Sequence, residues 1–220
     1  LVNETVTISH GLAGGGYDAV SMANFTATMT DNEIVTSSTG RVWMAYNLGA
    51  TQVCTSSTDE ACFGDLYQWG RAKDGHESRT SATTTNLASS ITTPEVNKFI
   101  VNGVSPYDWT ESGVDDGGSL RTAAWAVNDG TGICPAGFSV PTETELNTER
   151  GSWTTNNAAG AYGSKLKIPV AGYRTRTNGA FGNVGDYAYL WSRSANGTGG
   201  YYFAFGHVAF YGTSGRAFGN

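Results

Sequence analysis

Charged residues, and lysine above all, are scarce in this chain of 220 residues. They make up 15% of the sequence, whereas about 25% is usual for a globular domain. The 13 lysine and arginine residues are outnumbered by 19 aspartate and glutamate residues, so the net charge is −6. This balance argues against a nucleic-acid-binding protein, which normally has a basic surplus. Long apolar runs are also missing, because no stretch approaches the roughly 18 uninterrupted apolar residues of a membrane span.

Glycine and aromatic residues are abundant instead. Thirty of the 220 residues are glycine, about 14% against a usual ~7%. Six Trp, eleven Tyr and nine Phe indicate a buried core, which a disordered chain lacks. The residues that build helical bundles give way to Gly, Ser, Thr and Asn. This composition predicts one loop-rich domain of the β or α+β class, with room for a small additional piece.

Three cysteines are present, and two of them flank a short polar loop. Cys54 and Cys62 are placed to form a local disulfide, which leaves Cys134 either free or paired outside the segment. The alternative is three buried, reduced thiols, because cysteine packs like a small hydrophobic residue. Neither a Cys-x-x-Cys motif nor a Cys/His cluster is present, which argues against zinc.

Residues 1–33 differ from the rest of the chain. Two alternating, strand-like runs, 4–9 and 21–30, flank a turn that contains three consecutive glycines. This pattern predicts either the end of a preceding β-sandwich repeat or an N-terminal hairpin of the main domain. The chain begins with Leu1 and shows no signal peptide, so we expect a segment excised from a longer protein. Residues 34–220 are predicted to form a single domain.

The main domain contains several strand-like runs and one well-marked helix start. The runs lie at 40–49, 166–173, 187–191, 201–205 and 207–211, and most are separated by glycine turns. Thr142 and Glu145 have the spacing of a capping box, which predicts a helix from that point. Residues 72–120 are polar apart from a patch at 99–101, and this predicts a long loop region of the kind that carries function.

Four motifs stand out along the main domain. They are Arg41-Val-Trp-Met-Ala-Tyr-Asn-Leu-Gly49, Cys62-Phe-Gly-Asp-Leu-Tyr-Gln-Trp-Gly-Arg71 with Asp74-Gly-His76, Cys134-Pro-Ala-Gly-Phe-Ser-Val-Pro-Thr142 and Leu190-Trp-Ser192. Because they occur in the same order as in the Fibrobacter succinogenes major paralogous domain family, residues 40–220 resemble that family. The resemblance implies an α+β, C-type-lectin-like fold that is loop-rich, with small antiparallel sheets and about two helices. Trp43, Trp69, Trp125 and Trp191 would supply much of its core.

The family usually ends in a short tail that contains a cysteine, whereas this chain stops at Phe218-Gly-Asn220. The resemblance therefore implies that the partner of Cys134 lies on the missing tail.

The first candidate site is the aromatic and arginine-rich region after residue 173. Tyrosine and arginine are typical of binding hot spots, and related variable receptor-binding proteins display their ligand-contacting residues in this region. Alternation along strands predicts that about half of the set is core, and Arg193 and Arg216 have the alternative role of holding loops through ion pairs. The predicted ligand-binding residues are Arg174, Arg176, Asn178, Asn183, Asp186, Tyr187, Tyr189, Arg193, Tyr201, Tyr202, His207, Tyr211 and Arg216.

The second candidate is a calcium site in the loop region. Calcium takes six to eight oxygen ligands, which irregular loops supply, and many C-type-lectin-like domains bind it. The Glu-Pro-Asn and Gln-Pro-Asp triplets of calcium-dependent sugar-binding lectins are absent, and the alternative is a solvated acidic loop. The predicted metal ligands are Asp108, Glu111, Asp115, Asp116, Asn128 and Asp129.

Catalysis has little support in the sequence. The three histidines are scattered, and no nucleophile elbow, HExxH motif or formylglycine-generating cysteine pair is found. His76 follows Asp74 and Gly75 in a family motif, which favours a structural role in its loop.

We therefore expect a non-enzymatic, extracellular module of a large bacterial surface adhesin of the repeat-in-toxin type, monomeric within a longer chain. Its expected ligand is a peptide or protein on another cell surface, bound with calcium. The alternatives are a carbohydrate-binding module, a spacer without ligand and, last, an enzyme of the formylglycine-generating type.

Overall fold

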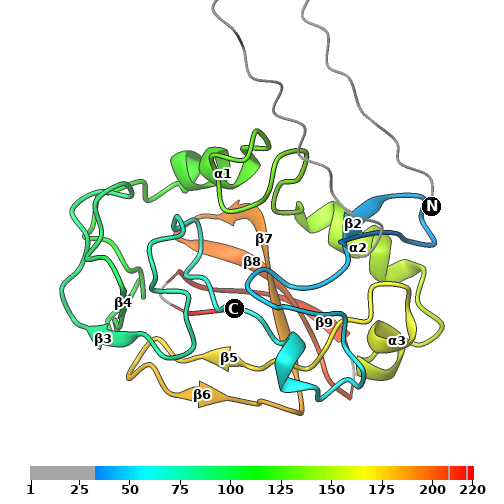
Figure 1. Ribbon diagram of the computed structural model, residues 1–220. Coiled ribbons are helices and arrows are strands. Elements are labelled where there is room, and N and C mark those ends of the chain that lie inside the picture. Colours follow the sequence, from blue (N-terminus) through cyan, green and yellow to red (C-terminus); the bar gives the residue numbers. More distant parts are fainter. Residues whose placement is uncertain (1–32, 208, 217) are drawn as a thin grey trace, which may run out of the picture.

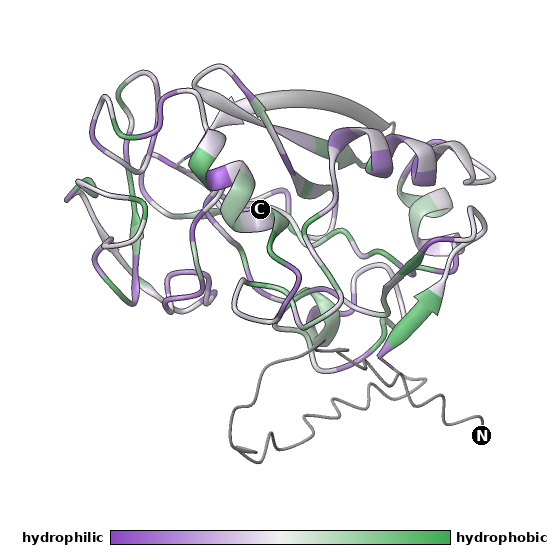
Figure 2. Cartoon of the chain, turned by 90° about the horizontal axis from the view of Figure 1, so that it is seen from above, coloured by the Kyte–Doolittle hydropathy of each residue, from purple (hydrophilic) through white to green (hydrophobic). Residues whose placement is uncertain are grey.

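The computed structural model describes residues 33–207, 209–216 and 218–220 (Figure 1). The hairpin predicted for the first 33 residues lies outside the described residues, except for Glu33. The described chain is a mixed α+β structure with three α-helices, one 3₁₀ turn and four small sheets. Loops make up much of it, and Figure 2 shows hydrophilic and hydrophobic residues alternating along them. None of the described helices has the length and apolar character of a membrane-crossing segment.

The largest sheet is an antiparallel meander of the C-terminal strands β7 (Ala188–Asn196), β8 (Gly199–Phe205) and β9 (Ala209–Gly215). These strands confirm the three aromatic runs predicted after residue 186. Leu190 pairs with Phe203, and the next residue, Trp191, pairs with Tyr202. Because side chains alternate along a strand, these two pairs lie on opposite sides of the sheet. The sheet lies in the middle of the molecule, with α1 above it and α2 and α3 to the right (Figure 1).

Three two-stranded sheets surround this meander. Strands β1 (Ile34–Thr36) and β2 (Val42–Met44) are antiparallel, as are β5 (Tyr173–Arg174) and β6 (Phe181–Gly182). Strands β3 (Ala82–Thr84) and β4 (Lys98–Ile100) are parallel, which corrects the expectation of antiparallel sheets. Residues 85–97 connect them, and this is the dozen or so residues that a parallel crossover needs.

The strand-like run at 166–173 contributes only its last residue to a strand. Pro169 has no N–H to donate to a sheet, and Lys167 has a φ of 50°, which a strand does not accommodate.

The helices are α1 (Ser119–Ala126), α2 (Glu143–Gly151) and α3 (Ala158–Gly163), and a 3₁₀ turn, η1, spans Glu60–Cys62. The capping box predicted at Thr142 and Glu145 is present at the start of α2. Helix α1 lies beyond the expected two helices, and its start carries no ordinary signal. Gly118 occupies its N-cap, and the side chain of Asp115 accepts from the N–H groups of Leu120 and Arg121 instead.

The core holds four buried tryptophans, and the indole N–H of each one donates to a backbone carbonyl. These are Trp69 to Ser192 at 2.8 Å, Trp109 to Trp69 at 2.9 Å, Trp125 to Arg71 at 3.1 Å and Trp191 to Tyr67 at 3.0 Å. Of the four predicted core tryptophans, Trp43 is only partly buried. Trp109 is fully buried although it lies in the predicted loop region. The loops after residue 72 therefore pack around a core of their own.

Candidate ligand-binding site

The three cysteines take two different states. Cys54 and Cys62 form a disulfide, as the sequence suggested, and η1 ends at Cys62. Cys134 is a free, buried thiol, and burial raises its pKa to about 11. A thiol with such a pKa is almost entirely protonated at neutral pH, so it acts as a packing residue.

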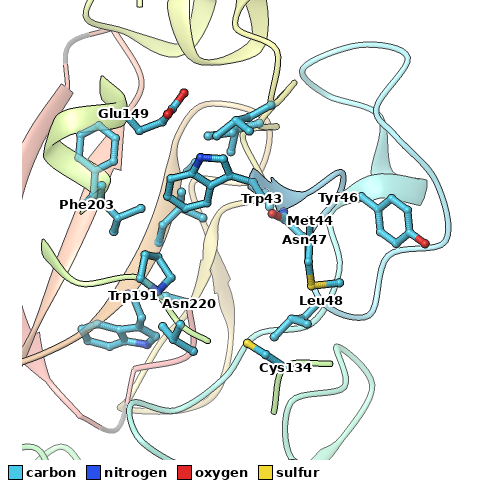
Figure 3. A pocket seen from close by; sticks show the side chains of 18 of the residues that line it. Trp43, Met44, Tyr46, Asn47, Leu48, Cys134, Glu149, Trp191, Phe203 and Asn220 are labelled. Atoms are coloured by element: carbon cyan, nitrogen blue, oxygen red, sulfur yellow. The ribbon is translucent and has the colours of Figure 1, made fainter. Parts of the chain in front are cut away.

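A cavity of about 350 Å³ opens between β2, the loop around residues 133–141 and the loop around residues 166–172. This volume is in the range of pockets that bind small molecules or single side chains. In Figure 3 the indole of Trp43 occupies the centre, while the ring of Tyr46 points away. The lining includes Trp43, Met44, Leu48, Cys134, Trp191 and Phe203.

Polar and charged groups also line the cavity, and two indole N–H groups among them lack partners in the described chain. Arg41 forms an exposed ion pair with Glu145 at 2.8 Å, and Glu149 accepts from the Thr39 hydroxyl at 3.1 Å. The indole N–H groups of Trp43 and Trp153 are buried without an acceptor among the described residues. Because buried donors are nearly always satisfied in native proteins, these two groups are donors that a water molecule or a ligand acceptor in the cavity would satisfy.

A line of partly exposed aromatic rings runs from the cavity toward the C-terminus, and we call it the aromatic row. It consists of Tyr187, Tyr189, Tyr173 and Phe218, with centroid separations of 6.3, 4.9 and 5.6 Å in that order. Tyr189 also lines the cavity, so the row and the cavity share one residue. Burial raises the pKa of Tyr189, and its hydroxyl accepts from the Asn183 amide at 2.9 Å. The neutral phenol therefore remains available as a donor.

The predicted ligand-binding set separates into surface and buried members. Asn178, Asn183, Asp186 and His207 are exposed, and Arg176, Tyr187, Tyr189, Arg193, Tyr201 and Tyr202 are partly exposed. The side chain of Tyr211 lies outside the described residues. Tyr173 and Phe218 join the surface although the sequence did not single them out. The sequence gives little indication that either residue belongs to a site, because single aromatic residues in a short strand or at a chain end are common.

The arginines of this set mostly hold loops. Arg174 is buried and donates to the carbonyls of Gly179 and Ser81 at 2.9 and 2.7 Å. Arg193 donates to the Val140 carbonyl at 2.7 Å. Arg216 is fully buried and pairs with Asp108 at 3.1 Å. Arg174 and Arg216 therefore lie beneath the binding surface instead of on it, because their guanidinium groups satisfy buried carbonyls and a carboxylate.

The predicted calcium ligands do not form an open oxygen cage. Both oxygens of Asp108 accept from Arg121, and the Asp115 carboxylate caps α1. Asp116 accepts from the Gly113 N–H, and Asp129 accepts from Thr131. Glu111 and Asn128 are exposed, and the structure brings neither into a cluster of acidic side chains with the others. Since the carboxylates serve cations and N–H groups of the protein, this set does not fit a calcium site of six to eight oxygens.

A different cluster, Asp74, His76 and Glu77, has donor atoms within 4.8 Å of one another and could hold a metal ion. Its contacts nevertheless form a closed network. Nε2 of His76 accepts from the Gln68 N–H at 3.1 Å, so the ring proton is on Nδ1, which donates to Asp74 at 2.8 Å. A metal would have to displace one of these bonds, and a histidine ligand is not typical of calcium.

Burial and hydrogen bonding act in opposite directions on the two carboxyl groups of this network. Burial alone would raise the pKa of Asp74 and of Glu77. Hydrogen bonds from His76 and from backbone N–H groups outweigh it and lower both pKa values. Both groups are therefore held ionised, as expected of a network that fixes the loop from residue 71 to residue 77.

No protein-family model, curated protein or solved structure matches the chain. The function is therefore argued from the site itself.

Proposed function

We propose that the chain is a non-enzymatic ligand-binding module that binds an extended peptide segment of a protein on another cell surface. The observation that carries this proposal is that Tyr189 belongs both to the apolar cavity and to the aromatic row. The two features together place an apolar pocket beside a series of partly exposed aromatic rings. Such a surface suits a chain molecule, with one side chain in the cavity and the following residues on the tyrosine rings.

The setting we propose is extracellular, in a bacterial surface adhesin with a C-type-lectin-like domain. The disulfide between Cys54 and Cys62 supports an oxidising compartment. The mixed α+β architecture, with its small sheets and long loops, is compatible with the fold that the four sequence motifs imply.

A binding role is favoured over a catalytic one by the state of the reactive groups. Both ring nitrogens of His76 are engaged within the protein, and the Cys134 thiol is buried with a raised pKa. We do not include calcium in the proposed binding site, because the acidic residues predicted to bind it accept hydrogen bonds from arginine and N–H groups. The experiment below tests its role with EDTA.

The experiment is to probe a random peptide array with the full chain, with and without EDTA, and to repeat it with Tyr189→Ala. We expect retention of specific peptides and a loss of at least tenfold in affinity for the variant, since truncating an aromatic hot-spot residue costs ~2 kcal/mol or more. Tyr162→Ala is the matched control, because Tyr162 is equally half-buried and contributes to neither the cavity nor the row.

Two results would overturn the proposal. Retention on a glycan array without peptide binding would establish a lectin, and binding to neither array would establish a spacer. A signal that disappears with EDTA would add an ion to the site, at residues other than the engaged carboxylates.

A further inference from the structure

Arg176 follows β5 and is placed between two aromatic rings. Its guanidinium carbon lies 3.9 Å from the ring centroid of Tyr107 and 4.6 Å from that of Phe218. The backbone is fixed at the same point, because the carbonyl of Arg176 accepts from the Asn102 N–H at 2.7 Å. Both rings lie within cation–π distance of the guanidinium and restrict its position.

Tyr107 is a rigid part of this arrangement. Its φ is 63°, and its N–H donates to the Val104 carbonyl at 2.7 Å. Gly215 packs so closely against Tyr107 that a Cβ at position 215 would lie 2.3 Å from the Cβ of Tyr107. The ring that covers one face of Arg176 is therefore fixed by local packing as well as by its own backbone.

The guanidinium of Arg176 has no hydrogen bond or ion pair with any residue that the structure describes, and its Nε is buried without an acceptor. The contrast with other arginines is sharp. Arg79 and Arg174 each donate to two backbone carbonyls, and the terminal nitrogens of Arg216 donate to carbonyls and to Asp108 although its Nε has no acceptor among the described residues. The buried Nε has no acceptor in the described chain, and the terminal N–H groups of this partly exposed residue are open to a partner outside it.

This cation lies at the end of the aromatic row, because Phe218 belongs both to the row and to the pair of rings around Arg176. We infer that Arg176 binds a carboxylate of the extended peptide, an inference that rests on the proposed peptide-binding function. The N–H groups of a guanidinium point outward in its plane, away from the rings that contact its face. A planar carboxylate accepts two parallel hydrogen bonds there.

Carboxylate fits better than phosphate at this position. A phosphate group carries nearly two negative charges and is usually bound by a cluster of arginines. Here the other arginines all donate to acceptors within the described chain, and the chain as a whole carries a charge of −6. One guanidinium matches one carboxylate, and the acidic chain would repel acidic peptides that fail to reach it.

The test uses peptides retained on the array, each synthesised in matched forms: aspartate or glutamate against asparagine or glutamine, and a free against an amidated C-terminus. We expect the carboxylate form to bind about 10- to 100-fold more tightly than its amide counterpart, from the strength of charge-assisted hydrogen bonds. If the loss of affinity follows the side-chain amide, Arg176 binds a side-chain carboxylate; if it follows the amidated C-terminus, Arg176 binds the terminal carboxylate.

Arg176→Gln should reduce the affinity for the carboxylate form to that of the amide form and leave the amide form unchanged. Arg176→Lys should recover only part of the preference, since it keeps the charge without the planar fork. Arg150→Gln is the control, because Arg150 lies in α2 and donates to Asn147 in the same helix.

Three outcomes separate the possibilities. Equal binding of carboxylate and amide forms by the wild-type chain overturns the role of Arg176 and leaves peptide binding intact. Equal loss of both forms in Arg176→Gln assigns Arg176 a structural role and also overturns the inference. Failure to retain any peptide overturns the proposed function itself.

Discussion

Asp108 connects two buried arginines, and its replacement by asparagine should strongly destabilise the fold. The carboxylate accepts from Arg121 at 2.8 Å through each oxygen and from Arg216 at 3.1 Å. Both arginines are fully buried; Arg121 lies in α1, and Arg216 directly follows β9. This one side chain therefore joins the loop at 108–116 to two distant parts of the chain.

The size of the effect follows from the charges left behind. Burial and the positive charge of Arg121 both lower the pKa of Arg216, and Asp108 opposes them. Asp108→Asn preserves the shape and leaves two adjacent, buried cations with only the more distant carboxylate of Asp115, 3.7 Å from Nε of Arg121, as a counter-charge among the described residues. Removing one member of a buried ion network costs roughly 3–5 kcal/mol, a large part of the ~5–15 kcal/mol that stabilises a typical domain. For a domain of about this size the melting temperature should fall by roughly 6–20 °C.

Urea unfolding followed by tryptophan fluorescence measures this loss. Asp116→Asn is the control, since its exposed carboxylate accepts only from the Gly113 N–H, and it should change stability by ~0.5 kcal/mol or less. A loss below ~1 kcal/mol for Asp108→Asn would refute the reasoning, because it would mean that the two arginines find other acceptors. If Asp108 were instead a calcium ligand, EDTA would destabilise the wild-type chain as much as the substitution does. We expect EDTA to leave its melting temperature unchanged.

Two further predictions concern titratable groups. Folding lowers the pKa values of Asp74 and Glu77 from 3.8 and 4.5, so the stabilisation from these groups is present above those values and is lost as the pH falls through the lower, folded pKa values. The free energy of unfolding should therefore drop below about pH 4. Asp74→Asn should flatten that decline, as measured by urea titrations at successive pH values. Cys134 should react with a thiol reagent at pH 8 at the rate of global unfolding, since it is buried and its pKa is about 11; rapid modification of the folded chain would show that the cavity admits the reagent.

The parts of the fold that the sequence predicts correctly are those with a local signal. The capping box at Thr142 needs only four residues, and it marks the start of α2 correctly. The alternating aromatic runs after residue 186 form β7, β8 and β9 because a half-buried strand imposes that pattern on its own residues. Helix α1 was missed because its capping carboxylate, Asp115, lies outside the usual N-cap position and is anchored by distant contacts.

The site was predictable only in part, and for a related reason. Tyrosines at alternate positions of β7 are visible in the sequence as a candidate surface, and Tyr187 and Tyr189 lie there. The exposure of an arginine depends on partners far away in the chain. Arg174 and Arg176 are two residues apart, yet the first is buried against Ser81 and the second lies between Tyr107 and Phe218. Residue type alone cannot distinguish them.

The excess of arginine over lysine has a physical explanation in this architecture. Long loops leave many carbonyl groups without a partner in a sheet or helix, and each must be satisfied if it is buried. A guanidinium with five donors in a fixed plane can bridge several carbonyls at once. Arg216 does this by reaching Asp115, Asp116 and Gly197, whereas the compact ammonium of lysine is poorly suited to it. In a domain where arginine serves this purpose so regularly, the guanidinium of Arg176, oriented but without an acceptor in the described chain, is best explained by a ligand.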